Sequence, residues 1–333
     1  MKNFSLLTAV VVLLGSAACD DKAKTKTAPV QLIFDTDFGP DYDDVGAITV
    51  LHALADSGQV NILATVASCS HPNAAAAIDV FNTYFGRPGL PIGVPKGPSV
   101  ADTDKQHWTD SVTANYPHRL RSNDEAPDAV EVYRKVLAAQ PDGSVTVVTV
   151  GFFTNLANLL NSAPDEFSDL TGKQLVSKKV KQLVSMAGWF PTGAEYNVKR
   201  DPIASMQVME QWPTPILLSG FHIGQKIKTG LPLINNAAIK NSPVKDAFRI
   251  AIPLDPQDSA GRMSWDQTAV LVAVKGYDPY YSIETGHMSV DSTGTNTWDT
   301  SRRGHARLVE KMEVSKVNKL IDELMMYQPK TKK

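Results

Sequence analysis

Cysteine is nearly absent from this sequence, which has only Cys19 and Cys69 in 333 residues. A disulfide framework is therefore excluded as the main source of stability. An excess of charge of one sign is also lacking, because 33 lysines and arginines stand against 35 aspartates and glutamates. This balance offers no broad basic surface for nucleic acid. Shares of 43% hydrophobic and 20% charged residues exclude a disordered, collagen-like or coiled-coil chain, so we expect a packed core.

The N-terminal segment has the pattern of a secretory signal. Lys2 precedes an apolar run from Leu6 to Leu14, which is too short to span a bilayer as a stable helix. Small residues then lead directly into Cys19, after which the sequence becomes polar. We therefore predict that residues 1–18 are a signal peptide and that the protein is secreted across the inner membrane.

The cysteine at this junction resembles the lipidated cysteine of a bacterial lipobox. A lipid on Cys19 would anchor the protein in the cell envelope, in the periplasm, and residues 19–29 would form a flexible tether. Cys69 would then be the remaining free thiol, and no internal disulfide could form. Ser16 stands where a lipobox more often has leucine, so ordinary secretion and a buried N-terminal helix remain alternatives.

Short apolar runs alternate with helix-like stretches through the rest of the chain. The predicted strands are residues 31–34, 60–66, 145–150, 180–186 and 215–218, and the predicted helices are residues 44–55, 74–85, 129–139, 156–160 and 202–211. The strand runs suit parallel strands buried on both faces. Their alternation with helices predicts an α/β fold with an open, doubly wound, mostly parallel sheet flanked by helices, and a ligand site beyond the carboxyl ends of the strands. No linker follows Pro29, so we predict one domain over residues 30–333.

The strongest chemical signal follows the first predicted strand. Residues 35–44 read DTDFGPDYDD, with five carboxylates in ten positions. Repulsion among so many carboxylates favours a bound cation, and oxygen ligands suit Ca²⁺ or Mg²⁺. A solvated acidic turn is the simpler alternative. An EF-hand is excluded, because Gly39 and Pro40 stand where a ligand and the turn glycine belong.

This segment resembles the aspartate signature of the inosine-uridine-preferring nucleoside hydrolase family, in a variant form with two more residues before the last aspartate pair. Three further segments resemble family motifs in the same order: GFFTNLANLL from Gly151, AEYNVKRDPIAS from Ala194 and SWDQTAVL from Ser264. Four motifs in order are specific. A haloacid-dehalogenase-type phosphatase also begins with Asp-x-Asp after a strand and stays an alternative, although Gly39 replaces its usual threonine or valine.

The resemblance implies a calcium-dependent enzyme that hydrolyses the N-glycosidic bond of ribonucleosides or related ribosides. Asp37 matches the family's catalytic carboxylate, which contacts the calcium ion and takes a proton from the attacking water. The residues that match metal ligands are Asp37, Asp44, Asp266 and, through its main-chain carbonyl, Thr154. Those that match residues holding the sugar or lining the site are Asp43, Met186, Glu195 and Asn197.

Several of these residues lie where a helix is predicted to begin and so have a structural alternative. Asp43 and Asp44 could simply favour the positive end of the following helix. Thr154 could be only a helix cap, and Asp266 could cap the helix after it.

The remaining polar residues are open to other interpretations. Glu195 and Asn197 could be solvated loop residues. Asp35 should point away from Asp37, because side chains alternate along a strand, and we interpret it as structural. Asp41 lies in the inserted part of the loop and stays undecided between ligand and bystander.

Two departures from the family pattern concern the leaving group and the sugar. Trp265 stands where many members have a histidine that assists the departing base, and Ser68 with Cys69 replaces a segment that often carries a sugar-contacting asparagine. Trp265 could instead stack on the base, as could Trp189 and Phe190, although core packing is an alternative for each.

No residue clearly replaces the missing histidine. His71 and His222 each follow a predicted strand and could supply an acid, or could be packed loop residues. The alternative function is therefore a non-catalytic periplasmic lipoprotein that binds ribosides. In either case we expect a small-molecule riboside as partner, no nucleic acid, membrane contact only through the lipid anchor, and a homo-oligomer by family resemblance.

Overall fold

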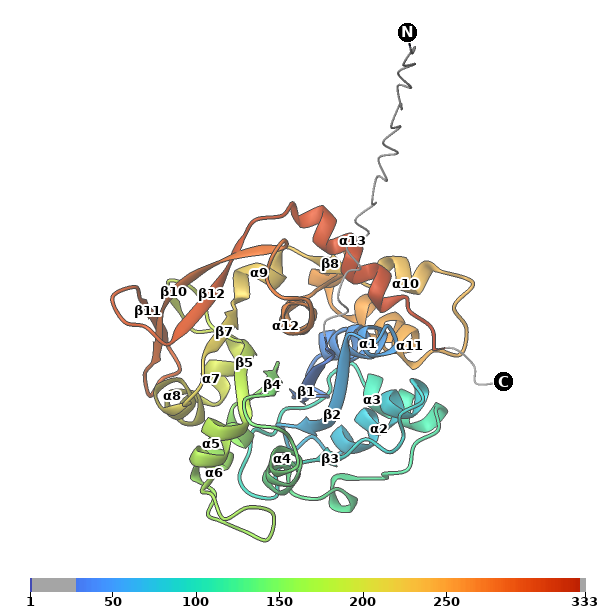
Figure 1. Cartoon of the computed structure of the whole chain (residues 1–333). Coiled ribbons are helices and arrows are strands. Elements are labelled where there is room, and N and C mark those ends of the chain that lie inside the picture. Colours follow the sequence, from blue (N-terminus) through green and yellow to red (C-terminus); the bar gives the residue numbers. More distant parts are fainter. Residues whose placement is uncertain (2–27, 330–333) are drawn as a thin grey trace.

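A ten-stranded sheet forms the centre of the computed structural model, which describes Met1 and residues 28–329 (Figure 1). Its strands lie in the order β3-β2-β1-β4-β5-β7-β12-β10-β11-β6. The strands are β1 (Val30–Thr36), β2 (Val60–Ala67), β3 (Ile92–Gly93), β4 (Val145–Thr149), β5 (Val180–Met186), β6 (Thr192–Gly193), β7 (Ile216–Ser219), β10 (Tyr281–Val290), β11 (Asn296–Asp299) and β12 (His305–Glu310). A separate small sheet pairs β8 (Lys228–Thr229) with β9 (Arg262–Met263).

The predicted α/β sheet is confirmed. All pairings from β3 through β12 are parallel, so the five predicted strands form the parallel centre of the sheet. The sequence analysis did not predict the end formed by β12, β10, β11 and β6, where β10 runs antiparallel to both β12 and β11. The sheet is therefore mixed, with an antiparallel extension on one side.

Helices cover both faces of the sheet. The α-helices are α1 (Asp43–Asp56), α2 (Ala74–Tyr84), α3 (Trp108–Asn115), α4 (Ala129–Ala138), α5 (Thr154–Asn161), α6 (Gly172–Lys179), α7 (Tyr196–Arg200), α8 (Pro202–Gln211), α9 (Phe221–Gln225), α10 (Leu231–Asn235), α11 (Pro243–Ala251), α12 (Trp265–Lys275) and α13 (Val314–Met325). Helices α1, α12 and α13 lie on one face, and α4, α5, α6 and α8 lie on the other (Figure 1). Among the described residues, none of these helices has the length and apolar character needed to cross a membrane.

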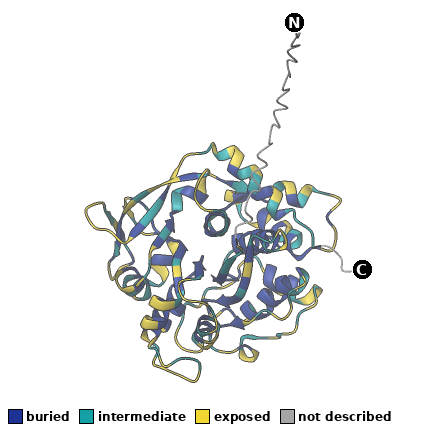
Figure 2. Ribbon diagram, viewed as in Figure 1, coloured by how far each residue is buried: buried dark blue, intermediate teal, exposed yellow. Residues whose placement is uncertain are grey.

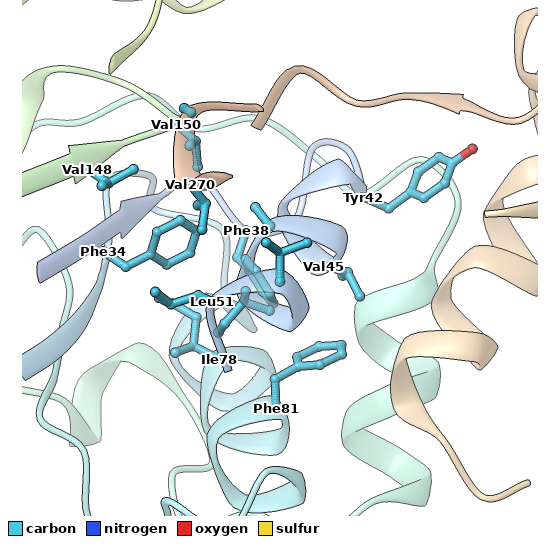
Figure 3. Packing of buried hydrophobic residues seen from close by; sticks show 14 of the residues in the cluster. Phe34, Phe38, Tyr42, Val45, Leu51, Ile78, Phe81, Val148, Val150 and Val270 are labelled. Carbon is cyan, nitrogen blue, oxygen red and sulfur yellow. The ribbon is translucent and has the colours of Figure 1, made fainter. Parts of the chain in front are cut away.

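Two apolar layers separate the helices from the sheet, and the central strands are mostly buried, β4 along its whole length (Figure 2). Phe34 of β1, Leu51 of α1 and Val270 of α12 belong to the layer drawn in Figure 3. Helix α1 is buried on all sides from Asp43 to Leu54, which is expected of a helix enclosed by other elements.

Helix α1 and helix α12 approach each other closely at Gly46. A Cβ atom on Gly46 would lie 2.2 Å from Nε2 of Gln267, so a larger residue would displace the Gln267 side chain that packs against α1 there. Both helices begin at the same edge of the sheet. This contact therefore fixes the first residues of α1 relative to those of α12.

The predictions made for the N-terminus lie mostly outside the described residues. The signal peptide, Cys19 and most of the 19–29 tether belong to that part, and the first residues of the fold that are described are Ala28 and Pro29.

Candidate active site

A cavity of about 370 Å³ opens at the carboxyl ends of the parallel strands. Its wall is strongly acidic. The acidic residues that line it are Asp37, Asp41, Asp43, Asp102, Glu195, Asp255 and Asp266. The edge of the sheet predicted to hold a ligand site is therefore the edge that carries the cavity.

The loop between β1 and α1 brings its carboxylates into this wall through two glycine contacts. Gly39 has a φ of +135°, and a Cβ atom there would lie 2.6 Å from Cγ of His71. Gly151, directly after β4, leaves room for Asp37, because a Cβ atom would lie 2.6 Å from the Asp37 nitrogen. Only glycine fits both positions, so the loop can lie close to the strand ends.

Three carboxylates form a cluster that could hold a metal ion. One oxygen each of Asp41, Asp44 and Asp266 lies within 4.8 Å of the others. Oδ1 of Asp44 accepts a hydrogen bond from Thr36, but the buried Oδ2 has no hydrogen-bond partner. A buried, unpaired carboxylate oxygen among like charges is costly, and a hard divalent cation would satisfy it. The donor set of this cluster therefore fits a metal ion.

The composition of this cluster differs from the ligand set predicted from the sequence. Asp44 and Asp266 belong to both, but among the described residues the structure adds Asp41 rather than Asp37. Asp37 lies beside the cluster in the cavity wall. Burial, followed by the neighbouring charges of Asp41, Asp43 and Glu195, raises the pKa of Asp37 well above its usual range.

The predicted ligand Thr154 is not brought to the cavity. It is the first residue of α5, and its hydroxyl donates to Asp201 at 2.7 Å. The residue at the end of β4 that does line the cavity is Val150, whose carbonyl accepts a hydrogen bond from Asn197 Nδ2 at 2.8 Å. Thr154 itself is not among the residues that line the cavity, and its predicted role as a main-chain ligand stays a prediction.

The residues expected to hold the sugar do line the cavity. Glu195 and Asn197 are 2% and 6% exposed, so neither is a solvated loop residue. Glu195 is the N-cap of α7 and accepts hydrogen bonds from the backbone nitrogens of Asn197 at 2.9 Å and Val198 at 3.3 Å. Burial raises the pKa of Glu195 to about 7. Met186, at the end of β5, forms part of the same wall.

Two aromatic rings, Phe221 and Trp265, form a part of the wall that we call the aromatic wall. The two rings lie 5.2 Å apart, and Trp265 Nε1 donates to the Phe221 carbonyl at 2.8 Å. Trp189 stacks on the outer side of Phe221 at 4.3 Å and does not line the cavity. Phe190 packs in the apolar layer on the face of the sheet covered by α4, α5, α6 and α8, as expected from core packing, the structural alternative for this residue.

Neither candidate histidine reaches the cavity wall. His71 packs under Gly39, and its Nδ1 accepts a hydrogen bond from the Asn73 nitrogen at 3.3 Å. His222 packs edge-on against Trp189 at 5.1 Å. Within the part of the chain that the structure describes, no histidine lines the cavity.

Arg262 is a cavity residue that the sequence analysis missed. Its guanidinium lies 3.0 Å from Asp41, 2.7 Å from Asp43 and 3.6 Å from Asp258. The charge pattern could have indicated it, because five carboxylates in ten positions need a compensating cation, and Arg262 precedes Asp266 by four residues.

Loop residues before α3 complete the rim of the cavity and were also missed. Asp102 and Lys105 line it from this side. Asp102 accepts a hydrogen bond from the Tyr196 hydroxyl at 2.7 Å and pairs with Arg200, so it joins the loop to α7.

The fold is that of the nucleoside hydrolases. The fold matches a plant nucleoside hydrolase with a TM-score of 0.69 at 18% identity, over 90% of this chain and 99% of that one. It also matches the purine-preferring ribonucleoside hydrolase of Gardnerella vaginalis with a TM-score of 0.69 at 17% identity, over 89% and 99% of the two chains.

The sequence supplies the family. Residues 32–320 match the inosine-uridine preferring nucleoside hydrolase model, and the chain belongs to this family. A curated relative, the pyrimidine-specific ribonucleoside hydrolase RihA of Citrobacter koseri, is 28% identical over 208 residues. That alignment covers 59% of this chain and 61% of the relative, so the chain spans about three-fifths of the relative's length.

Proposed function

We propose that this protein hydrolyses the N-glycosidic bond of ribonucleosides or related ribosides and depends on calcium. One observation carries the proposal: two residues of the metal-compatible carboxylate cluster, Asp41 and Asp266, line the same cavity as two buried sugar-compatible side chains, Glu195 and Asn197. Family membership supports the reaction class. The base is left open, because the named relatives include both purine-preferring and pyrimidine-specific enzymes.

The carboxylate cluster would hold the metal. Asp44 and Asp266 are ligands predicted from the sequence that also belong to the cluster, and Asp41 is the third carboxylate of that cluster. A bound calcium ion would draw two sugar hydroxyls together and make a nearby water molecule more acidic.

Asp37 is placed to act as the general base. It lines the cavity next to the cluster, and burial raises its pKa above the usual range, so its carboxylate is a better proton acceptor than that of an exposed aspartate. The Asp37 carboxylate takes the proton of the water that attacks the anomeric carbon. Breaking the N-glycosidic bond builds positive charge on the sugar ring, which the surrounding carboxylates stabilise.

The sugar and the base occupy different parts of the wall. Asp43 accepts a hydrogen bond from a ribose hydroxyl, and Glu195 with Asn197 holds the rest of the sugar. Trp265 and Phe221 offer flat apolar surface to an aromatic leaving group. No proton donor takes part on this side in the proposed mechanism.

The test is release of reducing sugar from a panel of nucleosides by the purified protein. We expect turnover that is lost after thorough chelation and restored by Ca²⁺, with Asp37→Asn as the inactive control. Binding of ribosides without turnover would instead support the riboside-binding alternative, which the lack of a histidine in the described cavity wall favours.

We also propose, from the sequence, that Cys19 is lipidated and that the protein is anchored in the bacterial cell envelope. Lipidation requires the thiol, so Cys19→Ser should move the protein from the membrane fraction to a soluble or unprocessed form. Unchanged fractionation would point to ordinary cleavage of the signal.

A further inference from the structure

Arg262 is a buried cation in the wall of an acidic cavity. Its side chain is 9% exposed, and it comes from β9, four residues before the cluster residue Asp266. An arginine is rarely buried in this way unless carboxylates pair with it. Here it contacts Asp41 and Asp43 around the start of α1 and Asp258, four residues before Arg262 itself.

The contacts with Asp43 are directional. Nε of Arg262 donates to Oδ1 of Asp43 at 3.0 Å, and Nη2 donates to the same oxygen at 2.7 Å. Oδ1 is therefore occupied by two charged donors. The other oxygen, Oδ2, accepts one long hydrogen bond of 3.4 Å from the Asp266 nitrogen. Asp43 lines the cavity, so Oδ2 is the oxygen with capacity left for a ligand hydroxyl.

The guanidinium plane is itself held by aromatic rings. Its Cζ lies 5.0 Å from the centre of the Tyr42 ring and 5.2 Å from the centre of the Trp265 ring. Tyr42 is fixed in turn, because its hydroxyl donates to Asp258 at 2.6 Å. Such a planar, forked donor between rings cannot be reproduced by a lysine ammonium, which is a single point charge on a flexible chain.

We propose that Arg262 is a positioning residue for sugar recognition: it holds the Asp43 carboxylate so that Oδ2 accepts a hydrogen bond from a hydroxyl of the ribose ring. The proposal deepens the proposed function and rests on it for the identity of the ligand. It also ties the sugar side of the cavity to the aromatic wall, because the same guanidinium packs on Trp265.

The experiment compares Arg262→Lys with the parent protein on a ribonucleoside and on its 2′-deoxy, 3′-deoxy and 5′-deoxy analogues. The parent protein should prefer the ribonucleoside over the ring-deoxy analogue that lacks the hydroxyl bound by Asp43. In Arg262→Lys the ratio of kcat/KM for the ribonucleoside to kcat/KM for that analogue should fall at least about tenfold. The corresponding ratio for the 5′-deoxy analogue should not change. Asp43→Asn should give the same pattern, and the double variant should lose no further preference, because both changes remove one interaction.

Arg134→Lys is the matched control. Arg134 is also buried, at 2% side-chain exposure, and pairs with Asp165 through Nε at 2.6 Å, but neither residue lines the cavity. This variant should lower the melting temperature without changing the preference among the analogues. If Arg262→Lys weakens all four substrates equally, as a purely structural arginine would, the inference is overturned.

Two further measurements separate this inference from the proposed function. In the Asp37→Asn background, calorimetric titration with ribose and the deoxy sugars reads the same preference without turnover. If the parent protein hydrolyses no riboside but Arg262→Lys still abolishes the preference for ribose over the ring-deoxy sugar, the inference is supported and the hydrolase is refuted. If Arg262→Lys leaves this preference unchanged, the inference is refuted. If Arg262→Lys does not fold, Arg262→Gln with Asp258→Asn removes one charge of each sign and must give the same collapse.

Discussion

The two sides of the cavity are built in different ways. On the carboxylate side, side chains from the loop after β1, from α1 and from α12 are held by close helix packing and by Arg262. On the aromatic side, Phe221 and Trp265 offer ring surface, and no histidine among the described residues lines the wall. Under the proposed function, the contrast assigns sugar binding and the leaving group to different sides of the cavity, so one side can change while the other is retained.

The contrast between the two sides of the cavity is tested most directly with substrates of different leaving-group acidity. Without an acid on the aromatic side, an activated riboside such as p-nitrophenyl riboside should be cleaved about 10² to 10⁴ times faster than inosine or uridine, which is the usual contribution of acid catalysis. Steady-state rates across a leaving-group series measure this. Equal rates would mean that an acid is present after all, and His222→Ala and His71→Ala would then locate it by slowing the natural substrates only.

The carboxylate side can be tested by comparing two neighbouring aspartates. Asp37→Asn removes the proton acceptor and should lower kcat by at least about 10²-fold. Asp41→Asn removes a cluster carboxylate that pairs with Arg262, and should weaken calcium binding more than it lowers kcat at saturating calcium. Kinetics at several calcium concentrations distinguish the two. The reverse pattern would assign the base to Asp41 and the ligand to Asp37.

Calcium should stabilise the carboxylate side. Because Asp44 and Asp266 come from distant parts of the chain, an ion bound between them favours the folded state by about 2.7 kcal/mol at a free concentration one hundred times Kd. Melting temperatures should therefore rise by several degrees when calcium is added to the chelated protein. Asp44→Asn is the control that should remove this rise. A melting temperature insensitive to calcium would remove the basis of the metal assignment.

The smallest expected effect concerns the aromatic wall. Trp265→Leu removes a ring that faces the cavity, and stacking of aromatic groups contributes about 0.5–1.5 kcal/mol, so KM for natural nucleosides should rise by up to about tenfold. Trp189→Leu, which removes a ring behind Phe221, should change KM little. If both substitutions act alike, the wall serves packing and not base recognition.

The sequence predicted the five central parallel strands and missed β3, β12 and the antiparallel strands. Strand β5 and helix α8 have the predicted limits, because valine, leucine and methionine residues mark the strand and a proline marks the start of the helix. The antiparallel strands were missed because β10 alternates only in part, with exposed and buried residues in groups. Their pairing depends on contacts with β12 and β11, which are distant in sequence or set by turns.

The sequence likewise predicted some residues of the site and missed others. Asp43, Glu195, Asn197 and Asp266 were found because each lies in a local motif, and all four line the cavity. Arg262 was missed, because its importance comes from carboxylates more than 200 positions away in the chain. Local patterns therefore indicated which residues carry the chemistry, but not which residue holds them in place.

The direction of β1 has a further consequence for how the molecule meets its surroundings. The strand begins at Val30 and ends next to Asp37, so at about 3.3 Å per residue the two ends lie roughly 20 Å apart, on opposite edges of the sheet. Whatever precedes Ala28 therefore joins the fold on the side away from the mouth of the cavity. If Cys19 is held at a bilayer, the mouth opens towards the aqueous compartment, where small solutes reach it by diffusion without crossing lipid. A purification tag or a surface-coupling group attached in place of the anchor would leave the mouth equally accessible.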